Sequence, residues 1–405
     1  MTSTATDLMH QVADPASRPD PYPLYAQLRR QRVSQVADGS YALARYADVV
    51  SLLHDPRISS DNHNAADKTG LNVQDNGPFI QRDPPEHDRL RAIAMRYFGP
   101  PSSPDMVTGQ EPEIQKFVDG LAADLPAQGP ADLVDKFAYP LPVSVICGLL
   151  GVPREDEPQF RVWTEGIVKG LDAQEQEGAD ELLRLRDKCQ AEMFVYVNGL
   201  IGKHREHPDG SMLSHLANDH SAGMMTDAQL GTTSVLLLIA GHETTVNLTA
   251  NGLLTLLRHP GALERLRAEP GWAMPVVEEL LRYEPPVQYL PNRFALDDIT
   301  VGDVTIPRGA RIILLLAAAC RDPERFDHPE RFDPDRADNE HLGFGSGVHY
   351  CFGAPLARLE AALSLTTLAR RLVSPRLVSD PPPYRPSPVL RGPVHLPVSY
   401  DNLRD

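Results

Sequence analysis

Cysteine is scarce in this chain, and its few copies are widely scattered. The 405 residues contain four cysteines, none of them in a CxxC pair. They are Cys147, Cys189, Cys320 and Cys351. A disulfide-stapled secreted scaffold needs a higher density of cysteine, and a structural zinc site needs about four ligands close together. The spacing excludes both classes and indicates thiols that stay reduced.

The sequence also lacks an excess of basic charge and any long apolar run. Asp and Glu number 55 against 39 Lys and Arg, a formal net charge of −16, which is the wrong sign for general nucleic-acid binding. Apolar runs such as VLLLIAG at 235–241 are far shorter than a membrane span. The N-terminal stretch MTSTATDLMHQVADP has no basic leader and no apolar segment. We therefore expect a soluble cytoplasmic protein without a membrane anchor.

No repeat or low-complexity linker divides the chain, so one domain is expected over residues 1–405, with an irregular tail at about 1–15. Helical periodicity dominates up to about residue 284, and short strand patterns follow near 297–315. The expected fold class is mainly α with small β-sheets, packed as one unit. A further strand is predicted at 41–46, and the polar, aperiodic segment 58–82 is predicted to be a loop that acts as a lid.

The clearest helix is predicted over residues 227–258. Thr226 can serve as its N-cap with Gln229 as the capping-box partner, and His259-Pro260 ends it. Its centre is apolar on all sides, which predicts burial through the core.

Cys351 differs from the other cysteines because of its surroundings, FGSGVHYCFG at 344–353. Gly345 and Gly347 allow a tight turn and a close backbone approach. A helix is predicted from Gly353 to about residue 371, and its N-terminus favours an anionic sulfur. The segment thus prepares a thiolate in a glycine-lined space that suits a flat ligand.

Other catalytic motifs fail at single positions. Ser346 lacks the flanking glycines of GxSxG, and Tyr350 occupies the last position of GxGxxG. His242-Glu243 begins an HExxH-like stretch, but Val246 replaces the second histidine, which excludes a zincin site.

FGSGVHYCFG is similar to the haem-ligand signature FGxGxHxCxG of the cytochrome P450 monooxygenases. The resemblance implies a single helical prism that encloses haem b, with Cys351 as the axial ligand of the iron. It also places Phe344, Gly345 and Gly353 against the haem. A thiolate ligand donates electron density that favours O–O cleavage.

AGHETT at 240–245 resembles the oxygen-activation motif of the same family. A threonine inside a helix can bond back to the carbonyl four residues earlier, here from Thr244 to Ala240, and Gly241 makes a local opening of the helix easier. The resemblance implies that Glu243 and Thr244 are catalytic and supply protons to the distal oxygen, with Ala240 beside the haem.

One pair of opposite charges lies at helical spacing. Glu279 and Arg282 in EELLR resemble the family's ExxR pair, and a third member is expected from a PERF segment. Arg331 is favoured over Arg325 by its distance from the cysteine loop. This triad is predicted to be structural, because it would hold the coil that carries Cys351.

The haem propionates require cationic or N–H partners. His87 and Arg91 lie four residues apart on one predicted helical face and resemble the family's HxxxR motif. Arg293 and His349 match further propionate ligands of the family.

The resemblance implies insertion of one oxygen atom of O2 into a lipophilic small molecule such as a steroid, terpenoid, macrolide or aromatic, by hydroxylation or epoxidation. Electrons would come from a separate ferredoxin and ferredoxin reductase, since no flavin or iron–sulfur segment is present. Arg89, Arg96 and Arg358 are candidates for the docking face. The predicted substrate pocket consists of residues from three regions and the loop 58–82: Leu236, Ile239, Ala240, Tyr289, Leu290 and Val389. A haem-thiolate isomerase or peroxygenase, and a haem-binding protein without turnover, are the alternatives.

Overall fold

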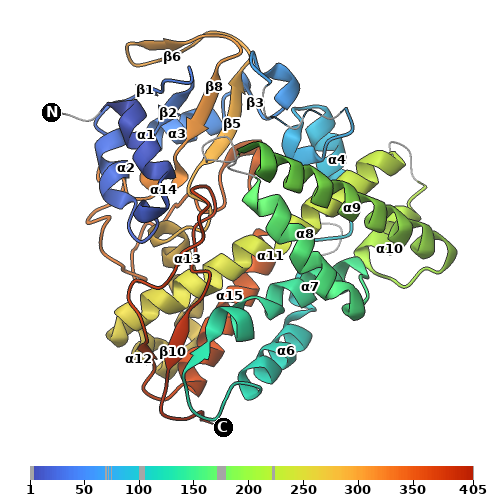
Figure 1. The fold of residues 1–405 in the computed structure, drawn as a ribbon, viewed down its shortest axis with the longest axis vertical. Helices are drawn as coiled ribbons and strands as arrows, with labels where there is room; N and C mark the ends of the chain where they lie inside the picture. The colour runs from blue at the N-terminus through green and yellow to red at the C-terminus, as the bar shows by residue number, and fades with distance from the viewer. Residues whose placement is uncertain are drawn as a thin grey trace.

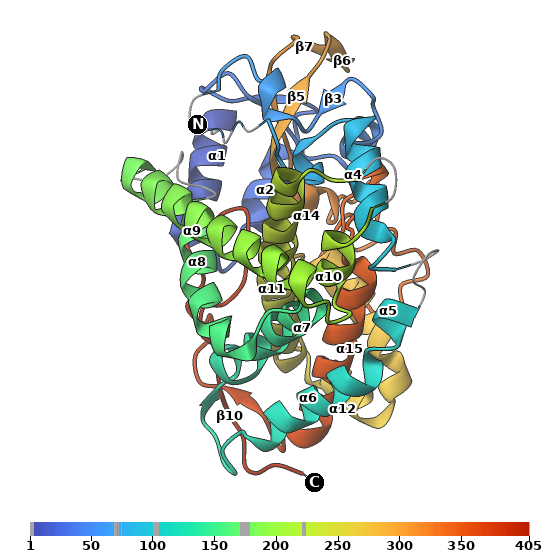
Figure 2. The same ribbon diagram turned by 90° about the vertical axis from the view of Figure 1, so that its right-hand side faces the viewer.

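The computed structural model describes residues 4–68, 71, 73, 75–99, 105–170, 179–220 and 224–404, and these form a mainly helical protein with small sheets (Figures 1 and 2). The helices are α1 (Ala5–Ala13), α2 (Tyr22–Leu28), α3 (Tyr46–Leu53), α4 (Glu86–Met95), α5 (Asp105–Thr108), α6 (Glu111–Ala123), α7 (Pro140–Leu150), α8 (Glu157–Lys169), α9 (Ala179–Glu206), α10 (Met212–Ala217), α11 (Asp227–Arg258), α12 (Pro260–Ala268), α13 (Ala273–Tyr283), α14 (Leu316–Ala319) and α15 (Ala354–Arg371).

The sheets are small. The strands are β1 (Ser34–Gln35), β2 (Tyr41–Leu43), β3 (Ile58–Ser59), β4 (Ala131–Asp132), β5 (Leu290–Ala295), β6 (Ile299–Val301), β7 (Val304–Ile306), β8 (Arg311–Leu314), β9 (Arg376–Leu377) and β10 (Pro397–Ser399). One sheet has the order β1-β2-β8-β5-β3, with only the β2–β8 pair parallel, and it gathers near α1 and α2 at one end of the molecule (Figure 1). A second sheet has the order β4-β10-β9, and β6 pairs with β7. The predicted class of mainly helix with minor sheet is confirmed.

Helix α11 passes through the middle of the fold, where α7, α9 and α15 pack against it (Figures 1 and 2). The predicted bounds are confirmed. The Thr226 hydroxyl accepts a hydrogen bond from the Gln229 backbone amide, the Gln229 side-chain oxygen accepts one from the Thr226 backbone amide, and the helix ends at Arg258. The predicted burial on all sides is wrong. Val235, Leu236 and Ile239 are only half-buried and Ala240 is exposed, and of these Leu236 and Ala240 border a cavity.

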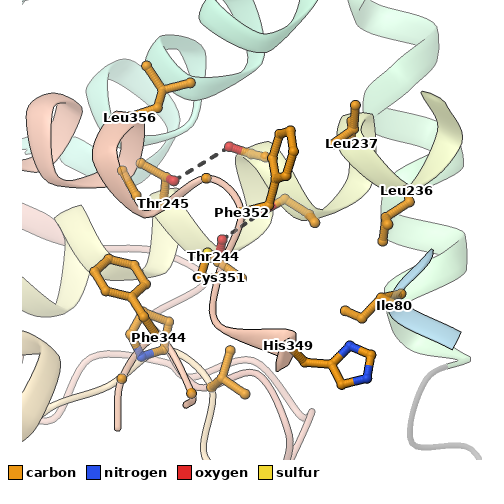
Figure 3. A pocket seen from close by; sticks show the side chains of 18 of the residues that line it. Ile80, Leu236, Leu237, Thr244, Thr245, Phe344, His349, Cys351, Phe352 and Leu356 are labelled. Atoms are coloured by element: carbon orange, nitrogen blue, oxygen red, sulfur yellow. Dashed lines mark hydrogen bonds between the residues drawn. The ribbon is translucent and has the colours of Figure 1, made fainter. Parts of the chain in front are cut away.

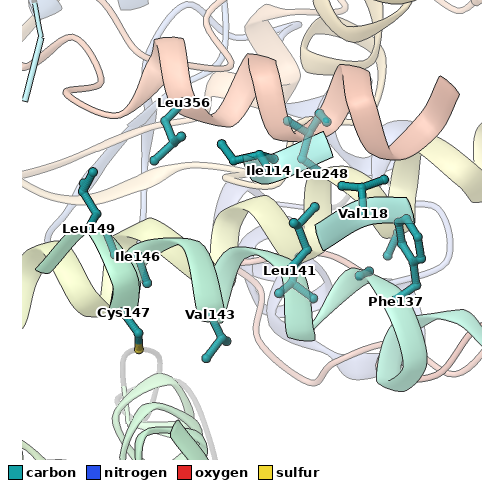
Figure 4. Packing of buried hydrophobic residues seen from close by; sticks show 14 of the residues in the cluster. Ile114, Val118, Phe137, Leu141, Val143, Ile146, Cys147, Leu149, Leu248 and Leu356 are labelled. Carbon is teal, nitrogen blue, oxygen red and sulfur yellow. The ribbon is translucent and has the colours of Figure 1, made fainter. Parts of the chain in front are cut away.

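Apolar side chains from most of the helices between α4 and α15 form the main core. Figure 4 shows Val118 of α6, Leu141 and Ile146 of α7, Leu248 of α11 and Leu356 of α15 meeting in it. Each fully buried leucine or isoleucine contributes about 1.5–3 kcal/mol relative to an exposed one. This packing fixes α11 and α15 against each other, which matters because both contribute to the cavity.

Two local predictions change in detail. The strand predicted at 41–46 is shorter, because β2 ends at Leu43 and α3 begins at Tyr46. The segment 58–82 is not wholly irregular, since it holds β3 and two 3-10 turns, η2 (Asn62–Asn64) and η3 (Phe79–Gln81). Its positions 69, 70, 72 and 74 lie outside the described residues.

Among the described residues, no helix has both the length and the apolar character that a membrane span requires.

Candidate active site

A cavity of about 260 Å³ lies between α11 and the segment around Cys351. Its walls come from α4, α7, α11, the end of α13, β5 and α15, and from the loop 343–353. Figure 3 shows Thr244 and Leu236 entering it from α11, and Cys351 and His349 from the loop. The sequence motifs that lie more than 100 residues apart therefore meet at one site, as predicted.

The loop before Cys351 is held in a tight, glycine-dependent shape. Gly345 and Gly347 both have φ of +69°, a region that residues with a Cβ rarely adopt. A Cβ on Gly347 would also collide with the Leu53 carbonyl oxygen. The Cys351 amide donates to the Phe344 carbonyl at 2.9 Å. The backbone thus fixes the sulfur at the cavity wall.

Two opposing effects act on the Cys351 thiol. Burial raises its pKa, while the amides of Gly353 and Ala354 and the charges of Arg91 and Arg358 lower it. The amides are those at the start of α15, so the predicted helix-terminus effect is present. Burial is the larger effect in the chain by itself. A bound metal ion would shift this balance toward the thiolate.

The cavity that holds the sulfur is also lined or bordered by buried nitrogen atoms that are incompletely paired among the described residues, although His87 Nδ1 already lies 2.7 Å from Asp88 Oδ1. His87 Nε2 and His349 Nδ1 are buried and make no hydrogen bond, and their rings are 4.4 Å apart between centroids. Among the described residues, Arg293 donates a hydrogen bond to the Asn292 carbonyl and has no acidic partner at ion-pair distance, and burial lowers its pKa to about 10. Burial, then Arg293, His87 and Arg91, lower the pKa of His349 to about 3. Such a group is incomplete until an anion enters it.

On α11, the Thr244 hydroxyl donates to the Ala240 carbonyl at 2.9 Å, as predicted. The helix nevertheless stays continuous, so the expected opening at Gly241 is not seen. Gly241 is required for another reason: a Cβ there would approach Ile146 of α7 to 2.8 Å. Glu243 does not line the cavity. Its carboxylate faces Arg385 at 3.4 Å.

The ExxR pair is completely buried. Glu279 and Arg282 form two hydrogen bonds, of 2.7 and 2.8 Å, and both side chains have 0% exposure. Arg282 also donates to the carbonyls of Cys320 and Pro329, and to that of Arg331. The pair thereby ties α13 to the coil that leads to the cysteine loop.

The prediction of Arg331 as third member of this triad is wrong. Its side chain is exposed, and only its backbone carbonyl contacts Arg282. Arg336 takes the place, with Nε 3.6 Å from Glu279 and a side chain only 9% exposed. The rival Arg325 pairs elsewhere, with Asp338 and Glu340.

Comparison with known proteins decides the family. The family model "Cytochrome P450" matches residues 38–271 and 272–396. The chain is 36% identical to Vitamin D(3) 25-hydroxylase of Pseudonocardia autotrophica, with 98% of each chain covered. It is 38% identical to cytochrome P450 monooxygenase PikC of Streptomyces venezuelae, covering 95% of this chain and 92% of PikC. The ligand-free structure of CYP164A2 from Mycobacterium smegmatis is 39% identical with a TM-score of 0.89, covering 97% and 99%.

The chain belongs to the cytochrome P450 family. It is a monooxygenase that binds haem b through a cysteine thiolate. The site fits this cofactor on its own evidence. A Cβ on Gly353 would meet nothing within 4 Å, so the backbone at the cavity wall leaves room for a flat ring. The unpaired buried nitrogen atoms His87 Nε2 and His349 Nδ1, together with the buried guanidinium of Arg293, suit its two propionates.

Three of the six individual residues predicted to line the substrate pocket of this P450 lie outside the cavity. Leu236, Ala240 and Leu290 line the cavity, whereas Ile239, Tyr289 and Val389 do not. Tyr289 and Val389 are buried in a separate apolar cluster with α1 and α2. Ile239 packs at the edge of the main core.

Phe79 and Ile80 of η3 belong to the loop 58–82, which was included in the predicted substrate pocket, and both line the cavity. Phe98, Val287 and Phe352 also line the cavity of this P450 and were not predicted. Phe352 packs on Phe98, with ring centroids 4.4 Å apart. A pair of apolar residues inside an otherwise polar loop, such as Phe79-Ile80, was a usable signal for contact with the cavity. The other residues have no local motif.

The revised triad leads to a prediction about stability. Arg336→Ala is expected to lower the free energy of unfolding by about 1.5–3 kcal/mol, because it removes hydrogen bonds to the carbonyls of Asp327 and His328 and a charge beside buried Glu279. Arg331→Ala should change it by no more than about 0.5 kcal/mol, as for other exposed side chains. Urea unfolding of both variants measures this. A larger loss in Arg331→Ala would contradict the assignment.

Proposed function

We propose that this P450 hydroxylates or epoxidises a lipophilic small molecule of the steroid, terpenoid, macrolide or aromatic type. The observation that carries the proposal is the apolar wall around Thr244. It includes Leu236, Leu237, Ala240 and Leu290. Few polar groups are available to select a hydrophilic substrate there, and apolar walls with isolated polar groups are usual for lipophilic ligands. The similarity to a protein named Vitamin D(3) 25-hydroxylase supports the same class.

The bound haem supplies activation of O2, and the chain supplies its setting. In the proposed roles, Cys351 holds the iron, while His87, Arg91, Arg293 and His349 hold the propionates. Phe344 supports the loop from beneath, with the Arg358 guanidinium 4.6 Å from its ring centroid. Thr244 Oγ1 holds a proton at the cavity wall, and Glu243 reloads it. Substrate bound against the apolar wall excludes water from that hydroxyl.

Electrons are proposed to come from a ferredoxin and its reductase, which dock at the face that carries the cysteine loop. The three arginines predicted for this face are paired within the chain: Arg89 with Glu86, Arg96 with Asp219 and Arg358 with Glu278. They offer little free charge. Val348 and Tyr350, which are 50% and 39% exposed, are apolar contacts next to Cys351. We also propose that the protein is cytoplasmic and that residues 1–405 form a single catalytic domain.

A spectral-shift screen followed by turnover tests this function. Lipophilic compounds that enter the cavity are expected to shift the haem absorption spectrum, because they displace water near the iron. With NAD(P)H, O2 and a surrogate ferredoxin and reductase, the binders should yield products heavier by one oxygen atom. Hydrophilic compounds of similar size serve as controls. If none of the lipophilic binders gives such a product, the proposed function is wrong.

Thr244 allows a matched prediction. Thr244→Val keeps the shape but removes the hydroxyl, so product formed per NAD(P)H consumed should fall at least about tenfold, the loss being one of proton delivery. Thr245→Val is the control, because Thr245 also lines the cavity and also bonds back within α11, to Gly241. We expect Thr245→Val to stay near the unmodified enzyme. Equal losses in the two variants would contradict the role of Thr244.

A further inference from the structure

A buried polar cluster surrounds Glu243 on the part of α11 that does not line the cavity. Its members are His242 and Glu243 of α11, Arg385 of the C-terminal segment, and Tyr139 at the start of α7. His242 Nε2 lies 3.7 Å from Glu243 Oε1, and Arg385 Nη1 lies 3.4 Å from Glu243 Oε2. The His242 and Glu243 side chains are only 4% and 2% exposed, so bulk water does not reach them.

Most polar atoms of this cluster have no hydrogen-bond partner. The buried atoms without one are Glu243 Oε1 and Oε2, His242 Nε2, Arg385 Nε and Tyr139 Oη. Buried polar atoms in folded proteins are nearly always paired, either within the protein or with ordered water. The two Glu243 oxygens and the three unpaired atoms His242 Nε2, Arg385 Nε and Tyr139 Oη supply enough polar partners for internal water, which needs two to four for each molecule.

The tautomer of His242 is fixed by its other nitrogen. Nδ1 lies 2.7 Å from the Leu238 carbonyl oxygen, which can only accept, so Nδ1 carries the hydrogen and Nε2 presents its lone pair to Glu243. Burial lowers the pKa of His242 and Arg385 lowers it further, while Glu243 and the Leu238 carbonyl act in the opposite direction. The ring is thus neutral near pH 7. It can accept a proton at Nε2.

The cluster continues outward from His242 to solvent. The Tyr139 ring meets the His242 ring edge-on, with centroids 6.2 Å apart. The Arg161 guanidinium carbon lies 4.4 Å from the Tyr139 ring centroid. Arg161 is 45% exposed and pairs with Asp135 and Glu165. Polar groups therefore connect the buried carboxylate with the surface in the order Glu243, His242, Tyr139, Arg161.

We propose that His242 and Tyr139, with ordered water between them, form the route by which protons enter the site and reload Glu243. A hydrated proton delivered by the water chain is transferred to His242 Nε2: an O–H bond of the hydronium ion breaks, an N–H bond forms and neutral water is left. The N–H bond then breaks as an O–H bond forms at Glu243 Oε1, which returns the ring to its neutral form, and Arg385 holds the carboxylate in place between transfers. No oxidant or reductant is consumed. His242 and Tyr139 are positioning residues, because they act through Glu243, and the inference rests on the proposed role of Glu243 and Thr244.

Two variants test the route during turnover. His242→Gln can still bond Leu238 but cannot hold a proton, and Tyr139→Phe removes only the hydroxyl. In each, product per NAD(P)H consumed should fall on the order of tenfold, less than the roughly 10²–10⁴-fold of direct general acid catalysis, because the internal water beside Glu243 can still transfer protons slowly. The control is Tyr196→Phe, a half-buried tyrosine of α9 whose hydroxyl bonds Asp156. It should behave as the unmodified enzyme.

Hydrogen peroxide separates proton delivery from loss of structure. In RH + H2O2 → ROH + H2O, both protons arrive with the oxidant, so His242→Gln and Tyr139→Phe are expected to match the unmodified enzyme. An equal loss with peroxide and with O2, or no loss with O2, overturns the route. If the unmodified enzyme gives no product with either oxidant, the proposed function itself fails.

A crystal structure of the resting enzyme gives a readout that does not depend on turnover. Ordered water is expected within hydrogen-bond distance of His242 Nε2 and of the Glu243 carboxylate. A cluster without water overturns the route. Haem content and the carbonyl spectrum of both variants should equal those of the unmodified protein, since neither residue contacts the haem cavity.

Discussion

Cys351→Ser is expected to abolish the red-shifted Soret band of the reduced carbonyl adduct, and with it all monooxygenase activity. Serine fits the site sterically, and the hydrogen bond from the backbone amide of residue 351 to the Phe344 carbonyl is retained, so the loop should keep its shape. The hydroxyl of serine does not ionise near neutral pH, whereas a metal can deprotonate a thiol outright. The substitution is therefore expected to remove one ligand atom of the iron and to leave the fold intact.

Difference spectroscopy of the reduced protein with carbon monoxide measures this, alongside haem content and circular dichroism. The matched control is Cys147→Ser, because Cys147 is buried in α7 and lies outside the cavity. The control should retain the thiolate band. A thiolate band in Cys351→Ser, or its loss in Cys147→Ser, would show that the iron ligand is another residue.

The site could be predicted from the sequence where the chemistry is local. Gly345, Gly347 and Cys351 lie within seven positions, and the turn that they form depends on their own φ angles. The hydrogen bond from the Thr244 hydroxyl to the Ala240 carbonyl follows from their spacing of four residues, which places them one above the other on the same helix face. The same helical geometry explains why Glu243 lies outside the cavity. Residues four apart share one face of a helix, so Ala240 and Thr244 both border the cavity, whereas Glu243 lies on a different face.

Other parts depend on contacts that no local pattern encodes. The requirement for Gly241 arises from Ile146 on another helix. Arg336 replaces Arg331 beside Glu279 because the coil 321–340 has no periodicity from which the direction of a side chain could be derived. On β5 the pairing with β8 shifts register between Leu290 and Arg293, so simple strand alternation does not predict which residues line the cavity.

Glu279→Gln is expected to be the most destabilising single change at this site. It leaves the guanidinium of Arg282 in the interior without a counter-charge, and removing one partner of a buried pair costs about 3–5 kcal/mol. A domain of ordinary stability has only about 5–15 kcal/mol in total. The carboxylate also accepts from the Asp333 amide at 2.8 Å, so the loss includes an anchor of the coil that leads to Cys351.

Thermal and urea unfolding of the purified variant test this prediction. Circular dichroism reports the loss of helix, and haem absorbance reports the loosening of the coil that leads to Cys351. Haem should be released at a lower urea concentration than the one at which helix is lost, because the coil loosens before the helical core unfolds. Glu264→Gln is the control: Glu264 pairs with Arg267 at the same spacing of three residues, but its side chain is 64% exposed. Exposed pairs contribute about 0–1 kcal/mol. A similar loss in both variants would mean that the Glu279–Arg282 pair does not hold the cysteine loop in place.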